Sequence, residues 1–509
     1  MSKEVRNLIT FLYHEKSTIV LLLTSLVIIT FLQSREISDF DIFWQIKLGQ
    51  LMLEQGHLIT SEPFSYTHFG ETIPSLGWLA QLIFAIIFNI GSWSAVQGFH
   101  VTLMTAAYLT VAWSSMREGM NGFCVFSAVV IGFLVGLSNS TVRPQSFALC
   151  CFALLLVALR KDMKISLKLL GLIPVLLIWQ NTHPSLAMGF VLTSAIAATA
   201  WVRWFLASEK VKPWGITMVW FMVVTAQIAT PIGTDIFTIS RINFDIVHDL
   251  GIDEWLHPWD KKVIRSMLFF WLALEISLFL LLRLKAKIKF TELSVFLVMT
   301  GLTLMSCRFA LFWGLAMIPI WARWINLLKP RHLFQWLDLN QNIHHPIPTS
   351  IFSIGFLAIF PVCWIFGPVT LASRIPMDGI HHLEQILPKG RIYNCREFGG
   401  PLILSGSPNW KIAIDGRLYL YPKRDWNEYF NMALGKLPLN IIIEKHNPDA
   451  FFLHPVYNRG LIKLLHQSSD WQKVYSDATC ITFIKKMNAC SINNNSLFMK
   501  EQKNADLYI

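Results

Sequence analysis

Charged side chains are scarce in this sequence of 509 residues. Asp, Glu, Lys and Arg make up 15% of the chain, whereas soluble domains carry about 25%. Hydrophobic residues account for 54%, and runs such as 17–33, 264–282 and 350–371 approach or reach the ~20 apolar residues that cross a bilayer as a helix. The shortage of charge therefore excludes an ordinary soluble protein and predicts a polytopic membrane protein.

Several common functional signatures are also missing. The sequence contains no P-loop, no dinucleotide fingerprint and no repeat of 20–50 residues. Its eight cysteines follow no metal-ligand spacing, and most lie in or beside apolar runs, where Cys usually packs as a small hydrophobe. Cys395 and Cys480 differ because both fall in a polar C-terminal region. Sequence alone leaves open whether these two form a disulfide.

The formal net charge of +11 does not indicate a nucleic-acid partner. Most of the basic excess lies in short loops between apolar runs, and such loops face the cytoplasm in membrane proteins. We therefore place the N-terminus and these loops on the cytoplasmic side. Residues 1–33 resemble a secretory signal, but the apolar stretch is long, lacks a clear cleavage site and precedes further spans, so we interpret it as an uncleaved first helix. The basic loops are 160–168, 203–212, 283–289 and 323–332.

The predicted fold class is mainly α, with about eleven membrane spans in residues 1–371. The segment 78–90 is apolar but short, and counting it as a span would divide the basic loops between the two sides. We therefore predict that 78–90 is an interfacial helix within an external loop, 35–94; demoting 146–159 instead is the rival solution. The predicted spans are 17–34, 95–115, 122–138, 144–160, 168–182, 184–205, 214–231, 265–283, 290–306, 309–327 and 350–371.

After residue 371 the composition becomes that of a globular domain, and this topology places it outside the membrane. Residues 372–487 predict a small external α/β domain, and the polar tail 488–509 predicts disorder. Within the domain we expect two short strands in 391–419, helices near 426–446 and 458–467, and one alternating strand in 474–486. The segment 232–263 is expected to be an external loop.

The first external loop contains the most suggestive polar residues. Residues 38–44 (SDFDIFW) place Asp39 and Asp41 two positions apart, directly after a predicted span. Carboxylates in such a position serve as general bases, as cation ligands or simply as helix caps. Spacing alone does not separate these roles.

Longer patterns resemble the GT-C superfamily of membrane glycosyltransferases, especially uncharacterised bacterial branches related to aminoarabinose and protein mannosyl transferases. The first loop reads D-x-D-x-x-W, then a helix ending in Gly56, then P-F-S-Y-T and W-L-x-Q. A departure from the family is Gly77, where relatives often carry a charged residue. Further similar stretches are 143–145 (RPQ), 179–183 (WQNTH), 230–233 (TPIG), 253–255 (DEW), 308–309 (RF), 398–400 (FGG) and 415–417 (DGR).

The resemblance implies an inverting transfer of a sugar from a polyprenyl-phosphate donor to an external glycan, lipid or protein acceptor. It also implies a place in the bacterial cytoplasmic membrane, with membrane lipids as neighbours and the C-terminal domain on the periplasmic side. Asp41 is the first choice for the catalytic carboxylate and Asp39 the second. Either can instead bind a divalent cation, and no firm cofactor or metal site is predicted.

Other site residues follow from the leaving group, which is a lipid phosphate. Arg143 and Arg308, at external ends of spans, are predicted to bind it, because Arg grips phosphate oxygens in pairs; the alternative is that they reach lipid headgroups. Substrate binding is predicted for His183, Glu254, Trp44 and Glu62. His183 can equally be structural, and Glu254, close to Trp255 and Trp259, can equally belong to an aromatic belt at the membrane interface.

Asp415 and Arg417 are expected to pair or cap within a structural turn, without a catalytic role. Two rival functions remain open at this stage. A lipid or glycan transporter would suit the many spans, although charged residues within spans are scarce apart from Glu275. A non-catalytic scaffold of glycan assembly would suit the departure at Gly77.

Overall fold

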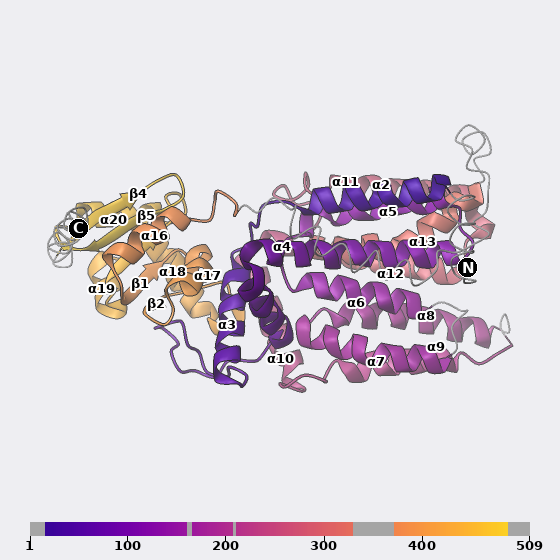
Figure 1. The fold of residues 1–509 in the computed structure, drawn as a ribbon, viewed down its shortest axis with the longest axis horizontal. Helices are drawn as coiled ribbons and strands as arrows, with labels where there is room; N and C mark the ends of the chain where they lie inside the picture. Colours follow the sequence, from indigo (N-terminus) through magenta and orange to yellow (C-terminus); the bar gives the residue numbers. More distant parts are fainter. Residues whose placement is uncertain (1–15, 160–164, 207–209, 329–370, 487–509) are drawn as a thin grey trace, which may run out of the picture. The chain divides into compact units, whose positions relative to one another are not determined.

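The computed structural model describes residues 16–159, 165–206, 210–328 and 371–486. Packing divides the chain into two compact units, and Figure 1 gives their elements. Unit 1 consists of Met1–Ile37, Leu76–Ile83 and Ile87–Thr370. Unit 2 consists of Ser38–Ser75, Phe84–Ile86 and Leu371–Ile509, so residues 38–75 of the predicted external loop group with the C-terminal domain.

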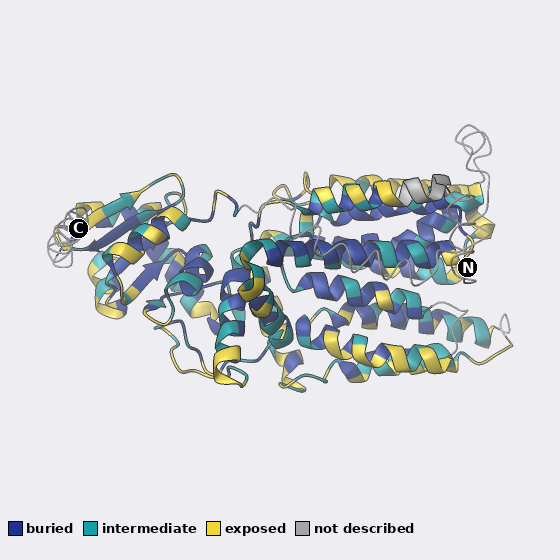
Figure 2. Cartoon of the chain, in the orientation of Figure 1, coloured by how far each residue is buried: buried dark blue, intermediate teal, exposed yellow. Residues whose placement is uncertain are grey.

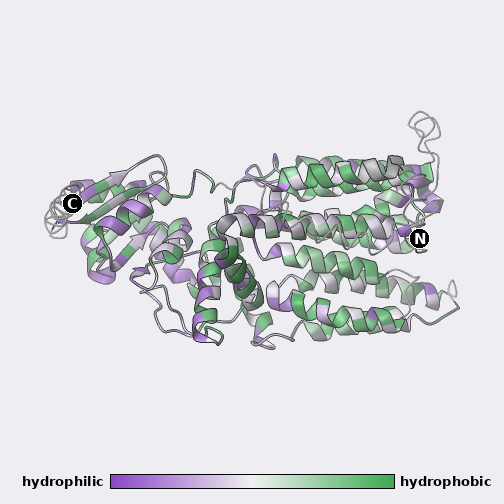
Figure 3. Ribbon diagram, in the orientation of Figure 1, coloured by the Kyte–Doolittle hydropathy of each residue, from purple (hydrophilic) through white to green (hydrophobic). Residues whose placement is uncertain are grey.

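Unit 1 is helical throughout its described residues, apart from short connections. By length and composition, five of its helical stretches can cross a membrane: Trp78–Arg117, Gly122–Asn139, Ile165–Thr182, Leu186–Phe205 and Cys307–Leu328. Shorter apolar helices accompany them, and the ribbon in Figure 3 is largely hydrophobic along these elements. The helices are α2 (Lys16–Gln33), α4 (Trp78–Arg117), α5 (Gly122–Gly136), α6 (Gln145–Ala158), α7 (Ile165–Thr182), α8 (Leu186–Phe205), α9 (Trp214–Ala226), α10 (Asp235–Leu250), α11 (Leu268–Leu284), α12 (Phe290–Met305) and α13 (Ala310–Leu328).

The outer faces of these helices expose apolar side chains that a water-soluble bundle would bury. On α7, Leu170 is 72% exposed and is followed at helical spacing by exposed Ile173 and Leu177. On α11, Phe279 and Leu282 are exposed in the same way. Continuous apolar surface of this kind marks contact with lipid or a partner. Unit 1 therefore has the surface of a membrane protein, as the sequence predicts.

The inner faces are packed closely where glycines or paired polar groups allow it. Gly132 of α5 and Gly314 of α13 lie backbone to backbone, and an added Cβ on either would come within 2.7 Å of the other's carbonyl oxygen. Three buried tryptophans of α13 each donate an indole N–H to a neighbouring helix, as buried Trp usually does. The acceptors are Thr300, Ser277 and Glu292, for Trp313, Trp321 and Trp324 respectively.

Helix α4 is two helices joined at a break. Gly91 and Ser92 leave helical conformation, with Ser92 at φ 54° and ψ −150°. The predicted interfacial segment 78–90 thus ends where the backbone turns away from the following helix. At the other end Gly77 precedes the helix in left-handed conformation, at φ 64°.

Unit 2 contains a mixed five-stranded sheet with strand order β2-β1-β3-β5-β4. Strands β1 and β2 are parallel, β1 and β3 are parallel, and β3, β5 and β4 run antiparallel to one another in that order. Figure 2 shows buried residues along the strands and exposed faces on the helices around them. The strands are β1 (Gly390–Asn394), β2 (Trp410–Ile412), β3 (Ala450–Leu453), β4 (Trp471–Ser476) and β5 (Ile481–Lys485).

Helix α3 of the first loop packs against α17 of the C-terminal domain, and Ser65 makes a parallel bridge with Ile412. Residues 38–75 of the loop are therefore an integral part of unit 2. The helices of this unit are α3 (Asp41–Gln55), α16 (Met377–Ile386), α17 (Gly399–Gly406), α18 (Lys423–Ala433), α19 (Leu439–His446) and α20 (Arg459–Gln467).

Several local predictions differ from the structure. The predicted strand 474–486 is a hairpin of β4 and β5, because the Asp477 carboxylate accepts the N–H groups of Thr479 and Cys480 and closes a turn. The predicted loop 232–263 contains helix α10. Cys395 and Cys480 are buried free thiols. The predicted span 350–371 lies almost wholly outside the described residues, as does the tail 488–509.

Candidate functional site

Three polar residues of unit 1 meet around one carboxylate. Arg143 lies just before α6, Glu254 lies in a short turn at Asp253–Trp255, and Arg308 lies in the turn Cys307–Phe309 before α13. Arg308 Nη1 is 3.2 Å from Glu254 Oε2, and Arg143 Nη1 donates to Glu254 Oε1. The two arginines predicted to bind phosphate therefore share an ion-pair partner, which is itself a predicted substrate-binding residue.

The turn that contains Glu254 is hydrogen-bonded to the turn that contains Arg308. Ser306 Oγ and Cys307 Sγ both donate to the Glu254 carbonyl oxygen, at 3.2 and 3.1 Å. The guanidinium of Arg308 lies 5.1 Å from the centre of the Trp255 ring, close enough for a cation–π contact. These contacts hold the backbone of Glu254 and the guanidinium of Arg308 in place.

The Glu254 carboxyl is charged within this cluster. Burial would raise the pKa of Glu254, but Arg143 and Arg308 together outweigh it and lower that pKa. The carboxyl therefore remains ionised beside the two guanidinium groups. Guanidinium groups held in this way also suit the oxygens of a phosphate.

His183, which follows α7, belongs to the same electrostatic environment. Burial first, and then Arg308 and Arg143, lower its pKa from 6.5 to about 3. The ring is therefore neutral at physiological pH. The N–H of Ser185 donates to Nδ1 at 3.2 Å, which leaves the ring proton on Nε2 and makes Nε2 a donor.

Unit 2 holds the carboxylates of the first loop. Asp39 is buried, and its Oδ1 accepts the backbone N–H of Asp41 at 2.8 Å, so it helps to start helix α3. Asp41 is the first residue of that helix, and its Oδ1 accepts the indole N–H of Trp44 at 3.1 Å. Negative charge is favoured at a helix N-terminus. Of the two carboxylates, Asp39 has the clearer capping role.

Glu62 lies in a fully buried ion cluster of the same unit. Both of its oxygens accept from Arg417, whose guanidinium also contacts both oxygens of Asp415, at 2.5 to 3.1 Å. The backbone N–H groups of Phe64 and Ser65 donate to Glu62 as well. The expected pairing within the turn of Asp415 and Arg417 is therefore present, with Glu62 as an additional partner.

The turn of Asp415 and Arg417 lies directly against Asp41. A Cβ added to Gly416 would lie 2.1 Å from Asp41 Oδ1, so only glycine fits there without movement. The guanidinium of Arg417 is 5.8 Å from the centre of the Trp44 ring. The first loop and the C-terminal domain thus jointly fix Asp41 and Trp44.

The sequence predicted these residues one by one, and the structure assembles them into two groups. Arg143, His183, Glu254 and Arg308 belong to unit 1. Asp39, Asp41, Trp44 and Glu62 belong to unit 2. Within the described residues, no three His, Cys, Asp or Glu side chains are grouped so as to hold a metal ion.

Two features of these groups are not predicted by the sequence: Ser306 and Cys307, which bind the carbonyl oxygen of Glu254, and the link from Glu62 to Arg417. Arg417 is 355 positions from Glu62 and Cys307 is 53 positions from Glu254, so no local pattern signals either contact.

Comparisons with known proteins place the fold. No family model matches the sequence, and no curated protein matches it. The apo oligosaccharyltransferase of Archaeoglobus fulgidus aligns over 85% of this chain and 69% of its own, at a TM-score of 0.54 and 11% identity. Apo ArnT of Cupriavidus metallidurans aligns over 94% and 99%, at a TM-score of 0.51 and 11% identity.

A second structure of the same ArnT, bound to undecaprenyl phosphate, aligns over 93% of this chain and 98% of its own, with a TM-score of 0.49 and 12% identity. The chain is structurally similar to GT-C glycosyltransferases, at low sequence identity.

Proposed function

We propose that this protein is a membrane glycosyltransferase that moves a sugar from a polyprenyl-phosphate donor to an acceptor at the external face of the membrane. The observation that carries the proposal is the cluster of Arg143, Glu254 and Arg308 on a fold similar to that of GT-C transferases. The proposal includes the eleven-span topology with a cytoplasmic N-terminus and an external unit 2.

In this proposal the arginine cluster holds the donor phosphate. A sugar phosphodiester carries one negative charge, and the polyprenyl phosphate that leaves carries up to two. Guanidinium donors beside the phosphate therefore stabilise the leaving group more strongly as its charge develops. Catalysis depends on such preferential stabilisation of the transition state.

Asp41 serves as the general base. It takes the proton from the acceptor hydroxyl while that oxygen attacks the anomeric carbon and the phosphate leaves with the bonding electrons, which inverts the anomeric centre. General-base assistance is worth ~10²- to 10⁴-fold in rate. Trp44 orients the Asp41 carboxylate, whereas Glu62 supports it indirectly through Arg417.

His183 contributes as a neutral donor. Its Nε2–H can bind a donor or acceptor oxygen without adding a third positive charge to the arginine cluster. A divalent cation at Asp39 and Asp41 remains a prediction, which titration of the purified protein with Mg²⁺ or Mn²⁺ would test.

The test uses the full chain, purified and reconstituted in liposomes, with radiolabelled polyprenyl-phosphate sugars. Wild type should transfer label to an external acceptor, and Asp41→Asn should transfer it ~10²- to 10⁴-fold more slowly. Glu54→Gln is the matched control, because Glu54 is an exposed carboxylate on the same helix α3. Its rate should equal that of wild type.

Equal transfer by wild type and Asp41→Asn would remove Asp41 from the catalytic role. Movement of labelled lipid across the bilayer without any covalent product would instead identify a transporter. Intact glycosylation of the acceptor in cells that lack the protein, with loss of a partner complex, would identify a scaffold.

A further inference from the structure

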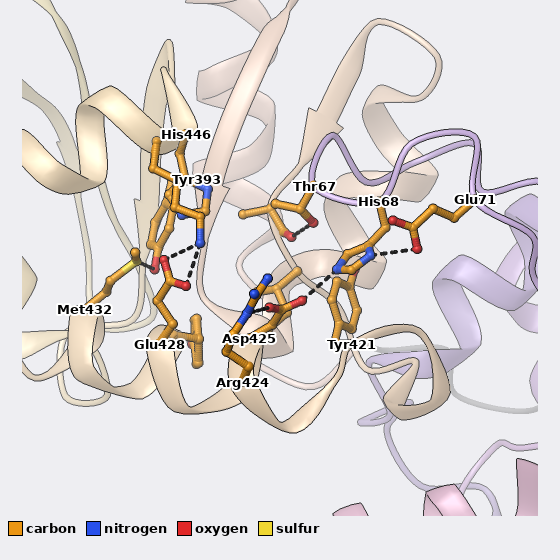
Figure 4. Close-up of a pocket in the computed structure, with 14 residues that line it drawn as sticks. Thr67, His68, Glu71, Tyr393, Tyr421, Arg424, Asp425, Glu428, Met432 and His446 are labelled. Atoms are coloured by element: carbon orange, nitrogen blue, oxygen red, sulfur yellow. Dashed lines mark hydrogen bonds and ion pairs between the residues drawn. The ribbon is translucent and has the colours of Figure 1, made fainter.

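Unit 2 contains a cavity of about 230 Å³ that the proposed transfer reaction does not use. Figure 4 shows it between the 67–71 segment of the first loop, the ends of the parallel strands, and helices α18 and α19. Small-molecule sites are typically concave, with mostly apolar walls and a few fixed polar groups. The cavity has both features.

The inner wall is aromatic and apolar. Tyr393, Tyr429, Ile414 and Met432 line it, and the Tyr393 hydroxyl donates to Met432 Sδ at 3.2 Å. Because the Tyr393 hydroxyl is hydrogen-bonded to another residue of the wall, the wall presents a largely apolar surface to the cavity. A wall of this kind suits the C–H face of a ring.

His446, which lines the same cavity, carries an unsatisfied polar atom. The residue is only 8% exposed, and its Nδ1 lies 3.3 Å from the Tyr66 hydroxyl. Its Nε2 has no hydrogen-bond partner among the described residues. Buried polar atoms in folded proteins are normally hydrogen-bonded, so an orphan that lines a cavity points to a ligand.

The rim carries carboxylates held in fixed positions. His68 Nε2 is 2.9 Å from Asp425 Oδ2, and Lys445 Nζ is 2.5 Å from both oxygens of Glu428. Figure 4 shows the pair of His68 and Asp425, and the Glu428 side chain, at the cavity. Each carboxylate retains capacity to accept from a hydroxyl, because an ionised carboxylate offers about four acceptor positions.

We propose that this cavity binds a neutral sugar ring. A pyranose presents an apolar face of C–H bonds and a perimeter of hydroxyls that both donate and accept. The aromatic wall matches the apolar face of the ring. The hydroxyl perimeter is matched by polar side chains of the cavity: Asp425, Glu428, Lys445 and His446. The binding does not depend on the transfer reaction and would occur even if unit 1 had another function.

Two other ligand classes fit the cavity less well. A phosphate or another anion is disfavoured because carboxylates outnumber cations on the rim. The carboxylates are Glu71, Asp425 and Glu428, and the cations are Arg424 and Lys445. A metal ion lacks a set of three protein ligands within the described residues. The volume is below the ~300–1,000 Å³ of typical drug-sized pockets, which favours a single ring.

The test measures binding of glucose, galactose, mannose, arabinose and N-acetylglucosamine to the full chain in detergent, by saturation-transfer NMR and calorimetry. At least one sugar should bind wild type with a millimolar dissociation constant. Glu428→Gln should weaken that binding about tenfold or more, since a hydrogen bond to a charged group is lost. Glu444→Gln is the matched control, because Glu444 is exposed on α19 and does not line the cavity.

A second variant guards against indirect effects. His446→Phe keeps a ring between Tyr66 and Tyr393 but removes Nε2, so it should also weaken binding while thermal unfolding stays cooperative. The proposal is overturned if none of the five sugars binds, if Glu428→Gln and Glu444→Gln bind equally well, or if inorganic phosphate displaces the sugar.

Discussion

Glu254 is the carboxylate that both arginines of unit 1 share, so its removal should leave two guanidinium groups without their common partner. Breaking a fully buried ion pair costs ~3–5 kcal/mol. The Glu254 side chain is 32% exposed, so solvent screening should reduce the loss in Glu254→Gln to about 1–2 kcal/mol. Chemical denaturation in detergent measures it. Asp253→Asn, at a side chain 70% exposed, should change stability by less than ~0.5 kcal/mol.

The neutral state of His183 gives a pH prediction. Its pKa is 6.5 in the unfolded chain and about 3 in the folded protein. Between these values the unfolded chain takes up a proton that folded His183 does not, so stability falls as the pH falls through this window. His183→Asn should therefore lose less thermal stability than wild type between neutral pH and the lower part of this window. Parallel losses in the two proteins would contradict the neutral assignment.

The site was predictable from sequence only as separate residues. Arg143, Glu254 and Arg308 each stand beside a predicted span, and chemistry indicated what each could bind. Their shared ion pair joins positions 111 and 54 residues apart, and no periodicity records such a separation. The contact of Glu62 was equally unpredictable. The sequence suggested that Glu62 binds substrate, whereas in the structure it is buried against Arg417.

At the scale of elements, the contact between α5 and α13 depends on two glycines. An added Cβ on Gly314 would lie 2.5 Å from the Gly132 carbonyl oxygen. Gly314→Ala should therefore force the helices apart and cost ~1–3 kcal/mol, the usual range for overpacking. Gly301→Ala on α12 is the control, because nothing lies within 4 Å of its added Cβ. Equal unfolding free energies for these two variants would refute the close contact.

The backbone geometry at position 77 requires glycine, independently of any catalytic role. It has φ 64°, and an added Cβ would lie 3.0 Å from the Thr182 carbonyl oxygen. Gly56 has φ 72° but nothing within 4 Å. Both Gly→Ala changes should destabilise by ~1 kcal/mol for the left-handed backbone, and Gly77→Ala should cost more because of the clash. Thermal unfolding of the two variants gives the comparison.

The apolar helices were the most predictable elements, because continuous apolar runs leave little choice of structure in lipid. The predicted span 122–138 corresponds to α5 (Gly122–Gly136), and 184–205 to α8. Helix α10 was missed because its polar residues suggested a loop, although its apolar residues recur at helical spacing. The hairpin of β4 and β5 was missed because the Asp477 turn interrupts an alternation that reads as one strand.

At the scale of the whole molecule, the residues of the proposed reaction belong to two different units. Unit 1 contributes the arginine cluster for the donor phosphate, and unit 2 contributes Asp41. Unit 2 is itself built from segments at both ends of the chain, since the loop 38–75 completes the C-terminal domain. This arrangement ties the first loop to the folding of residues more than 300 positions later.

The most direct test of the central claim is the rate of sugar transfer by Arg308→Lys at saturating polyprenyl-phosphate donor. Lys keeps the charge but loses the paired donors of Arg, so kcat should fall by ~10²-fold, the typical loss when a charge-stabilising donor is removed. Arg265→Lys, at an exposed position, is the matched control and should keep the wild-type rate. An unchanged kcat in Arg308→Lys would contradict the role of this cluster in stabilising the leaving phosphate.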